Sequence, residues 1–129
     1  MRFFKNKYLL LLLTLSICSC SDDPAQLKLS EDVINIGNVS DDPNLFQYKI
    51  NLKNIGDQLL LIENIRTSCS CVEGHVENVL LKGGEKTVLT IDVDTKNFDE
   101  GEINRELGIY SNSKDSPAIL KIVGVMRKK

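Results

Sequence analysis

The sequence contains no tryptophan and a single histidine, and aromatic residues make up only 5% of its 129 positions. The formal net charge is −2, and no stretch of the chain forms a basic stripe. Nucleic-acid binding needs clustered Lys and Arg facing phosphates, or aromatic rings on which bases stack. We therefore predict that the protein does not bind nucleic acid.

The sequence also lacks an apolar run long enough for a membrane span. Its longest apolar stretch begins at Tyr8 and ends near Ile17, well short of the roughly 20 residues that a spanning helix needs. Basic residues precede this stretch and small residues follow it, which is typical of a secretory signal. Residues 1–19 are therefore predicted to be a signal peptide.

The end of this signal, Ile17-Cys18-Ser19-Cys20, resembles the lipobox of bacterial lipoproteins. Cys20 is the better lipid acceptor because a small serine precedes it, whereas Cys18 follows the bulky Ile17. Diacylation plus an amide-linked chain would supply the two hydrophobic signals that stable anchoring needs. The following Ser21-Asp22-Asp23 is similar to the acidic tag of surface lipoproteins in the Bacteroides group. We expect an outer membrane lipoprotein of the cell envelope, periplasmic or surface-exposed; the alternative is a soluble secreted protein.

Cleavage would leave about 110 residues (129 minus 19), a length that suits one domain. Loss of the three basic residues in the signal would change the formal charge from −2 to about −5. Residues 20–32 are polar and include Pro24, so we interpret them as the lipidated cysteine and a flexible tether. Residues 33–126 form the predicted domain, and residues 127–129 a basic tail.

The alternation of apolar and polar residues in the predicted domain indicates short β-strands separated by turns. Residues 46–52 and 89–93 alternate apolar and polar side chains, which indicates strands with one buried face. We expect the first strand to end at Gly37 and residues 59–65 to be covered on much of both faces. Turn residues recur about every ten positions without helical periodicity, which predicts an all-β, antiparallel, immunoglobulin-like β-sandwich of about seven strands.

Cys69 and Cys71 are the only cysteines left once Cys18 is removed and Cys20 is lipidated. Residues i and i+2 on an extended strand lie about 6.6 Å apart at Cα, near the upper limit for a disulfide, so a bond would need a bend at Ser70. The favoured interpretation is structural, as buried thiols or an inert disulfide. A second is a Cu(I) or Zn(II) site with His75. A third is a reversible redox pair.

A metal site at this pair would need a further ligand, and Glu73 or Glu77 is the nearest carboxylate. A catalytic Cys-His dyad is not expected, because His75 follows the cysteines too closely for a strand to orient the two groups. Asp92 and Asp94 fall on the predicted solvent face of a strand. We therefore predict no catalytic residues, no enzymatic activity and no resident cofactor, with copper or zinc as the alternative.

Four short motifs resemble those of the domain of unknown function 1573 family, which includes lipoproteins of Bacteroidetes. They are Asn54-Ile55-Gly56, Ser68-Cys69-Ser70-Cys71, Gly83-Gly84-Glu85 and Tyr110-Ser111-Asn112. The resemblance covers residues 33–125 and implies an immunoglobulin-like fold without established catalytic activity. Two positions depart from the family pattern: Ser70 stands where the family has glycine, and Val72 where threonine is usual.

These observations together predict a lipid-anchored β-sandwich that serves as a binding or assembly module in the cell envelope. Such a module would present loops or a sheet edge to another envelope protein or a glycan, while lipid on Cys20 contacts the membrane. The alternative hypothesis is a metal-handling or thiol-redox accessory protein that uses Cys69 and Cys71.

Overall fold

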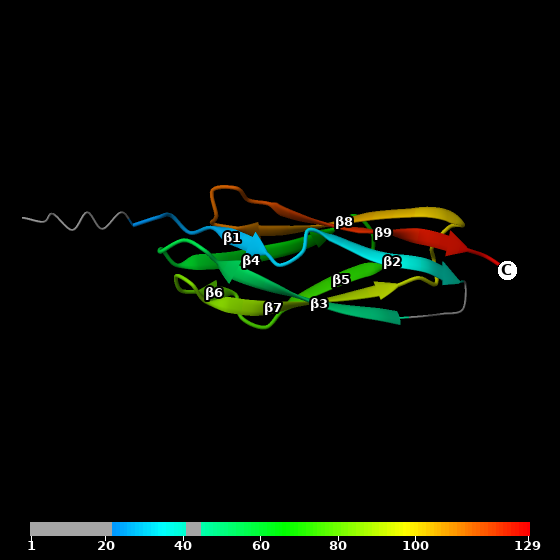
Figure 1. Cartoon of the computed structure of the whole chain (residues 1–129), viewed down its shortest axis with the longest axis horizontal. Helices are drawn as coiled ribbons and strands as arrows, with labels where there is room; N and C mark the ends of the chain where they lie inside the picture. Colours follow the sequence, from blue (N-terminus) through cyan, green and yellow to red (C-terminus); the bar gives the residue numbers. More distant parts are fainter. Residues whose placement is uncertain (1–21, 41–44) are drawn as a thin grey trace, which may run out of the picture.

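The computed structural model describes residues 22–40 and 45–129 and contains two packed β-sheets (Figure 1). Within these ranges no helix is long and apolar enough to cross a membrane. The strands are β1 (Leu27–Leu29), β2 (Val33–Ser40), β3 (Leu45–Asn54), β4 (Leu60–Thr67), β5 (Val72–Val76), β6 (Leu80–Leu81), β7 (Lys86–Asp94), β8 (Gly101–Ser111) and β9 (Ala118–Arg127).

The first sheet has the strand order β1-β3-β7-β5, and the second has the order β2-β9-β8-β4-β6. The predicted all-β sandwich is confirmed. It differs from the expectation in two short extra strands, β1 and β6, and in a parallel pairing of β2 with β9. A parallel pair cannot be joined by a tight hairpin. Here the chain between the two strands builds most of the domain, so they meet side by side.

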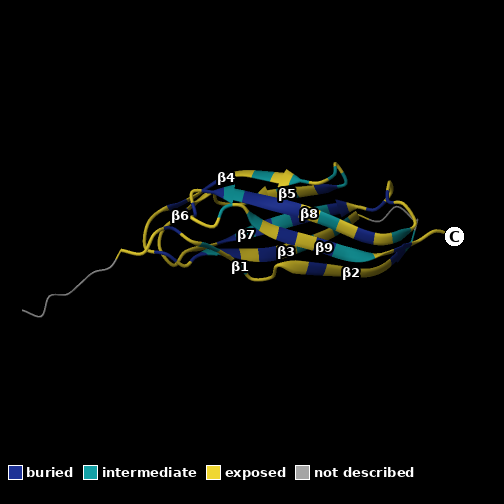
Figure 2. Ribbon diagram, turned by 90° about the horizontal axis from the view of Figure 1, so that it is seen from above, coloured by how far each residue is buried: buried dark blue, intermediate teal, exposed yellow. Residues whose placement is uncertain are grey.

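The core consists of aliphatic side chains that alternate with exposed ones along each strand (Figure 2). Leu89, Ile91 and Val93 of β7 are completely buried, as their alternation predicted, and so are Leu107 and Ile109 of β8. Each such side chain contributes about 1.5 to 3 kcal/mol when fully buried. Aliphatic side chains therefore supply most of the core, and Phe98 is a buried aromatic member of it.

β2 does not end at Gly37, contrary to the prediction. The strand continues to Ser40 through a register shift between Asn35 and Gly37, and Gly37 adopts a φ of +70°. The Asn35 Oδ1 accepts a hydrogen bond from the Gly37 N–H at 2.8 Å. Glycine adopts this left-handed conformation without steric cost, so it forms a β-bulge inside the strand instead of closing it.

The prediction that residues 59–65 are covered on both faces is wrong. Leu60 and Ile62 are buried, but Leu59 and Leu61 are 52% and 38% exposed. The sandwich has only two layers, so each sheet keeps one face toward solvent. β4 therefore alternates like the other strands, even though its sequence is nearly continuous in apolar residues.

The tether predicted for residues 20–32 is shorter than expected. β1 pairs with the end of β3, and Ala25 is buried with Leu60 and Leu81 in a small second cluster. The domain therefore includes residues before the predicted boundary at position 33. At the other end, β9 extends into the predicted basic tail as far as Arg127. The signal peptide and Cys20 lie outside the described residues.

Candidate functional site

The cysteine pair lies where the chain passes from one sheet to the other. β4 ends at Thr67 in the second sheet and β5 begins at Val72 in the first, so four residues make the crossing. A disulfide joins Cys69 to Cys71, and their Cα atoms are 5.2 Å apart. That separation is shorter than the roughly 6.6 Å of an extended strand, so the chain bends at Ser70 as a bond requires.

Ser70 is compatible with this bend, so the serine in place of the glycine expected from the family resemblance does not prevent it. None of the non-glycine residues in the described ranges has a positive φ, so the turn does not need a left-handed conformation at Ser70. Hydrogen bonds to the carbonyls of both cysteines hold the corner. The Asp94 N–H donates to the Cys71 carbonyl at 2.8 Å, and the Thr67 hydroxyl donates to the Cys69 carbonyl at the same distance.

The position of the disulfide fits the structural interpretation. Both cysteines are half-buried and pack against the main core. His75 lies elsewhere: it is exposed, and its Nε2 is 3.7 Å from the Glu73 Oε2 on the same strand. In the part of the chain that the structure describes, no group of three or more His, Cys, Asp or Glu side chains is placed to hold a metal ion. Metal binding by reduced cysteines stays a prediction.

Gly74 allows β5 to lie close to the second sheet, which the sequence analysis missed. A Cβ atom at this position would lie 3.0 Å from Ile65 Cγ2 and 3.0 Å from Leu107 Cδ1. Such contacts are tighter than ordinary packing, so a larger residue would require the Ile65 and Leu107 side chains to move. A glycine inside a strand-like sequence is the signal that could have indicated this close approach.

A groove of about 310 Å³ separates β4 from β5 along one side of the sandwich. Ile65 and Asn64 line it from β4, and Gly74, His75 and Val76 line it from β5. Its walls therefore combine aliphatic side chains with polar groups and strand backbone. The cysteine corner closes one end of this pair of strands, since it joins them directly.

The free edge of β5 exposes unpaired backbone groups to this side of the molecule. Of the described strands, β5 pairs only with β7, where the Asp94 N–H donates to the Cys71 carbonyl and the Glu77 N–H donates to the Val88 carbonyl. Because hydrogen-bonded positions alternate in an antiparallel pair, the N–H and C=O groups of Gly74 and Val76 point away from β7. β5 also lacks the proline, lysine and bulge that commonly protect sheet edges.

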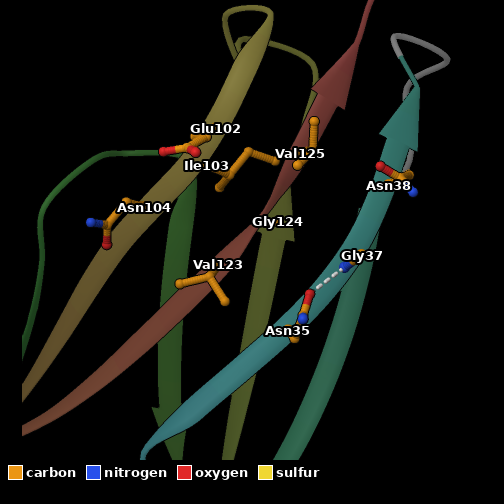
Figure 3. A pocket seen from close by; sticks show the side chains of 9 residues that line it. All are labelled: Asn35, Gly37, Asn38, Glu102, Ile103, Asn104, Val123, Gly124 and Val125. Carbon is orange, nitrogen blue, oxygen red and sulfur yellow. Dashed lines mark hydrogen bonds between the residues drawn. The ribbon is translucent and has the colours of Figure 1, made fainter.

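β2 forms an edge of the second sheet and is protected. Its bulge interrupts the regular ladder, and the Asn35 side chain occupies the N–H of Gly37. Beside the bulge is a shallow hollow of about 470 Å³ on the outer face of the sheet (Figure 3). Asn38 and Asn104 line it along with Val123. The bulge therefore makes β2 a poor template for a further strand.

Comparison with known proteins identifies the family. The sequence model of the family described as "Protein of unknown function (DUF1573)" matches residues 27–126. The chain belongs to this family. No curated protein matches the sequence.

Solved structures of low sequence identity share the fold of this DUF1573 domain. A protein of unknown function from Porphyromonas gingivalis W83 has a TM-score of 0.70 at 18% identity, over 81% of this chain and 48% of that one. The PapD-like domain 7 of human CEP192 has a TM-score of 0.60 at 7% identity, covering 81% and 87%. These likenesses confirm the immunoglobulin-like sandwich. This chain spans about half of the P. gingivalis protein.

An enzyme also shares the sandwich, but the likeness is limited to the fold. The VesB protease of Vibrio cholerae has a TM-score of 0.56 at 18% identity, over 78% of this chain and 32% of the protease. At such identity only the architecture can be compared. The predicted absence of enzymatic activity stays a prediction, and nothing in these likenesses shows activity in the DUF1573 domain.

The segment Asn54-Ile55-Gly56 has a clear structural role at the end of the sandwich opposite the cysteines. The buried Asn54 side chain makes four hydrogen bonds: it accepts from the N–H groups of Gln26 and Gly56, and donates to the carbonyls of Gln58 and Leu81. Gly56 is needed for space and not for a positive φ, because a Cβ there would collide with the Pro24 carbonyl.

Proposed function

We propose that this DUF1573 domain is a binding module of the cell envelope that takes up an extended segment of a partner protein at the β5 edge. The observation that carries the proposal is the outward orientation of the Gly74 and Val76 backbone groups beside the groove. An extended peptide can pair with such an edge as an additional strand, and main-chain hydrogen bonds then supply affinity. Neighbouring side chains supply specificity.

The groove suits alternate side chains of an added strand. Ile65 and Val76 offer aliphatic contact, while Glu73 and His75 face solvent on the outer surface of β5. Because side chains of a strand alternate between two faces, one set would enter the groove and the other would lie beside this polar pair. The partner segment favoured by this arrangement alternates apolar and polar residues and carries no proline.

Anchoring at the membrane is part of the proposal. The lipobox ending at Cys20 supports attachment through lipid, and the described domain begins only a few residues later. A lipid anchor would hold the β5 edge near other envelope proteins and raise their effective concentration. The partner is therefore proposed to be an envelope protein; a glycan ligand would instead leave the β5 backbone uninvolved.

The proposal is tested by placing a photo-crosslinking residue at His75 in cells that express the protein. The matched control carries the same residue at Asn38, which is exposed on the protected β2 edge and leaves the Asn35–Gly37 hydrogen bond intact. A partner segment found at His75 is then added as a purified peptide, and amide hydrogen exchange is measured.

We expect protection of the Gly74 and Val76 amides and loss of binding in Val76→Pro. Equal crosslinking from both positions, or exchange that the peptide does not slow, would contradict strand addition.

The disulfide itself leaves one alternative function to test. A thiol-redox role predicts that Cys69 and Cys71 exchange with a partner dithiol under mild conditions, whereas a structural bond resists it. Intact-mass measurement of the mature protein, native and after reduction, reports the disulfide, any bound metal and the lipid on Cys20 together. A disulfide that persists against a physiological thiol pool would exclude the redox alternative.

A further inference from the structure

Three lysines lie side by side on the outer face of the first sheet. Strand pairing places Lys28 of β1 opposite Lys53 of β3, and Lys53 opposite Lys86 of β7. The flanking Leu52 and Thr87 are buried, so the three lysine side chains project from the opposite, solvent-facing side of the sheet. The three residues, which we call the lysine row, are distant in the sequence and meet only through strand pairing.

Such a row is unfavourable unless something neutralises it. Like charges directly opposite one another on neighbouring strands destabilise a sheet. Among the described residues no carboxylate lies within ion-pair distance of the lysine row. The nearest acidic residue in sequence, Glu85, is directed into its own turn, where its Oε2 accepts the Lys82 N–H at 2.8 Å. The row therefore remains uncompensated in a chain whose net charge is −2.

Like charges also meet at the acidic end of the same sheet, but there they are moderated. Asp92 lies opposite Glu73, and both have polar partners. The Gln47 Nε2 donates to Asp92 at 2.9 Å, and His75 lies beside Glu73. Among the residues that the structure describes, the lysine row has no corresponding partners, which marks it as the part of this surface that is complementary to an anion.

A hollow of about 260 Å³ adjoins the lysine row. All three lysines line it together with Ser30 and Asn51, and no carboxylate does. The Ser30 hydroxyl accepts the Asn51 N–H at 3.0 Å, so its own hydrogen remains available to a ligand. Ammonium groups combined with a hydroxyl donor match the oxygen-rich, multiply charged surface of a phosphate.

We propose that the lysine row binds a phosphate group. The site lies apart from the β5 edge, and so it goes beyond the proposed strand addition. Phosphate can come from a membrane headgroup or from a soluble ligand. Lys28 follows Cys20 by eight positions (28 minus 20), a chain length that reaches at most about 29 Å, so headgroups near the proposed anchor are within range.

The experiment uses the full chain carrying Cys20→Ser, so that no lipid attaches it to vesicles independently of the lysines. Lys28→Gln/Lys53→Gln/Lys86→Gln removes the row, and Lys96→Gln/Lys121→Gln/Lys128→Gln removes three exposed lysines elsewhere as a charge-matched control. Binding of inorganic pyrophosphate is measured by amide chemical shifts. Binding to vesicles of phosphatidylglycerol or of phosphatidylcholine is measured by co-sedimentation.

We expect the row variant to lose at least about tenfold in affinity and the control less than about twofold, with binding weakened as salt is raised. Pyrophosphate binding that depends on the row supports a soluble phosphate ligand. Row-dependent binding confined to phosphatidylglycerol vesicles supports a headgroup. Failure to bind either probe, or equal losses in both variants, would overturn the proposal. Because β5 is unchanged in every variant, the outcome is independent of strand addition.

Discussion

The two ends of the sandwich are held together by different chemistry. At the end where β1 enters, the buried Asn54 side chain connects three separate segments through four hydrogen bonds. At the other end, one covalent bond joins Cys69 to Cys71 across a single residue. The first arrangement links residues far apart in the chain, whereas the second links near neighbours that the backbone already keeps close.

A feature that is easy to find in the sequence is not necessarily the one that stabilises the fold most. The cysteine pair is conspicuous in the sequence, whereas the asparagine is not. Closing a loop of three residues removes little entropy from the unfolded chain, about 1.6 kcal/mol in the loop-entropy treatment. A buried polar side chain that satisfies several backbone groups stabilises more, because its removal leaves each group without a partner. The asparagine is therefore expected to matter more for stability than the cysteine pair.

The largest expected effect is that of Asn54→Ala. The substitution leaves two N–H groups and two carbonyls without their partner, two of them buried and two part-buried, and we expect a loss of about 3 kcal/mol in the free energy of unfolding. Chemical denaturation measures it. Asn51→Ala is the control, because Asn51 lies on the same strand but is exposed, and should cost less than about 0.5 kcal/mol. Equal losses would remove the distinction between the two ends.

The second effect is that of Cys69→Ser/Cys71→Ser. We expect a loss of about 1.6 kcal/mol, smaller than that of Asn54→Ala, because only a short loop is opened. Reduction of the unmodified protein should lower its stability by a similar amount, which controls for the serine side chains. A loss greater than that of Asn54→Ala would reverse the comparison and make the cysteine corner the principal stabilising feature.

The smallest expected effect on stability is that of Lys53→Gln. It tests the residue next to Asn54, at the same end of the sandwich. Lys53→Gln removes the central charge of the lysine row, and we expect a gain of about 0.5 kcal/mol in stability at low salt. The gain should disappear near 1 M salt, where screening acts within about 3 Å. Lys121→Gln is the control of opposite sign, because Lys121 lies across from Glu106 and its loss should destabilise. A gain that salt does not alter would exclude charge repulsion as its cause.

Local pattern predicted most strands correctly and failed at particular residues for physical reasons. The alternation at Leu89, Ile91 and Val93 is confirmed because a strand with one wet face leaves this period in any sequence. The prediction that the first strand ends at Gly37 is wrong because glycine also fits a β-bulge inside a strand. β1 was assigned to a tether because three residues are too few to show a period, and its place is decided by pairing with β3.

The candidate sites were only partly predictable. The sequence located the cysteine pair, and the bend at Ser70 then showed that the two sulfurs meet. His75 is close to the cysteines along the chain, but its side chain is exposed beside Glu73, whereas the cysteines pack against the core. The lysine row was missed, and the absence of a basic stripe in the sequence was misleading about the surface, since lysines spaced far apart leave no local signal.

The sequence by itself therefore determined the fold class, the family and the faces of most strands, because burial of alternating aliphatic side chains is a local property. Tertiary structure alone decided that the β5 edge stays open and that the three lysines of the lysine row lie side by side. It also decided which backbone groups the buried Asn54 side chain binds. These features depend on the register between strands that are distant in the chain. Register is set by the packing of the whole sandwich, and no short window of residues contains it.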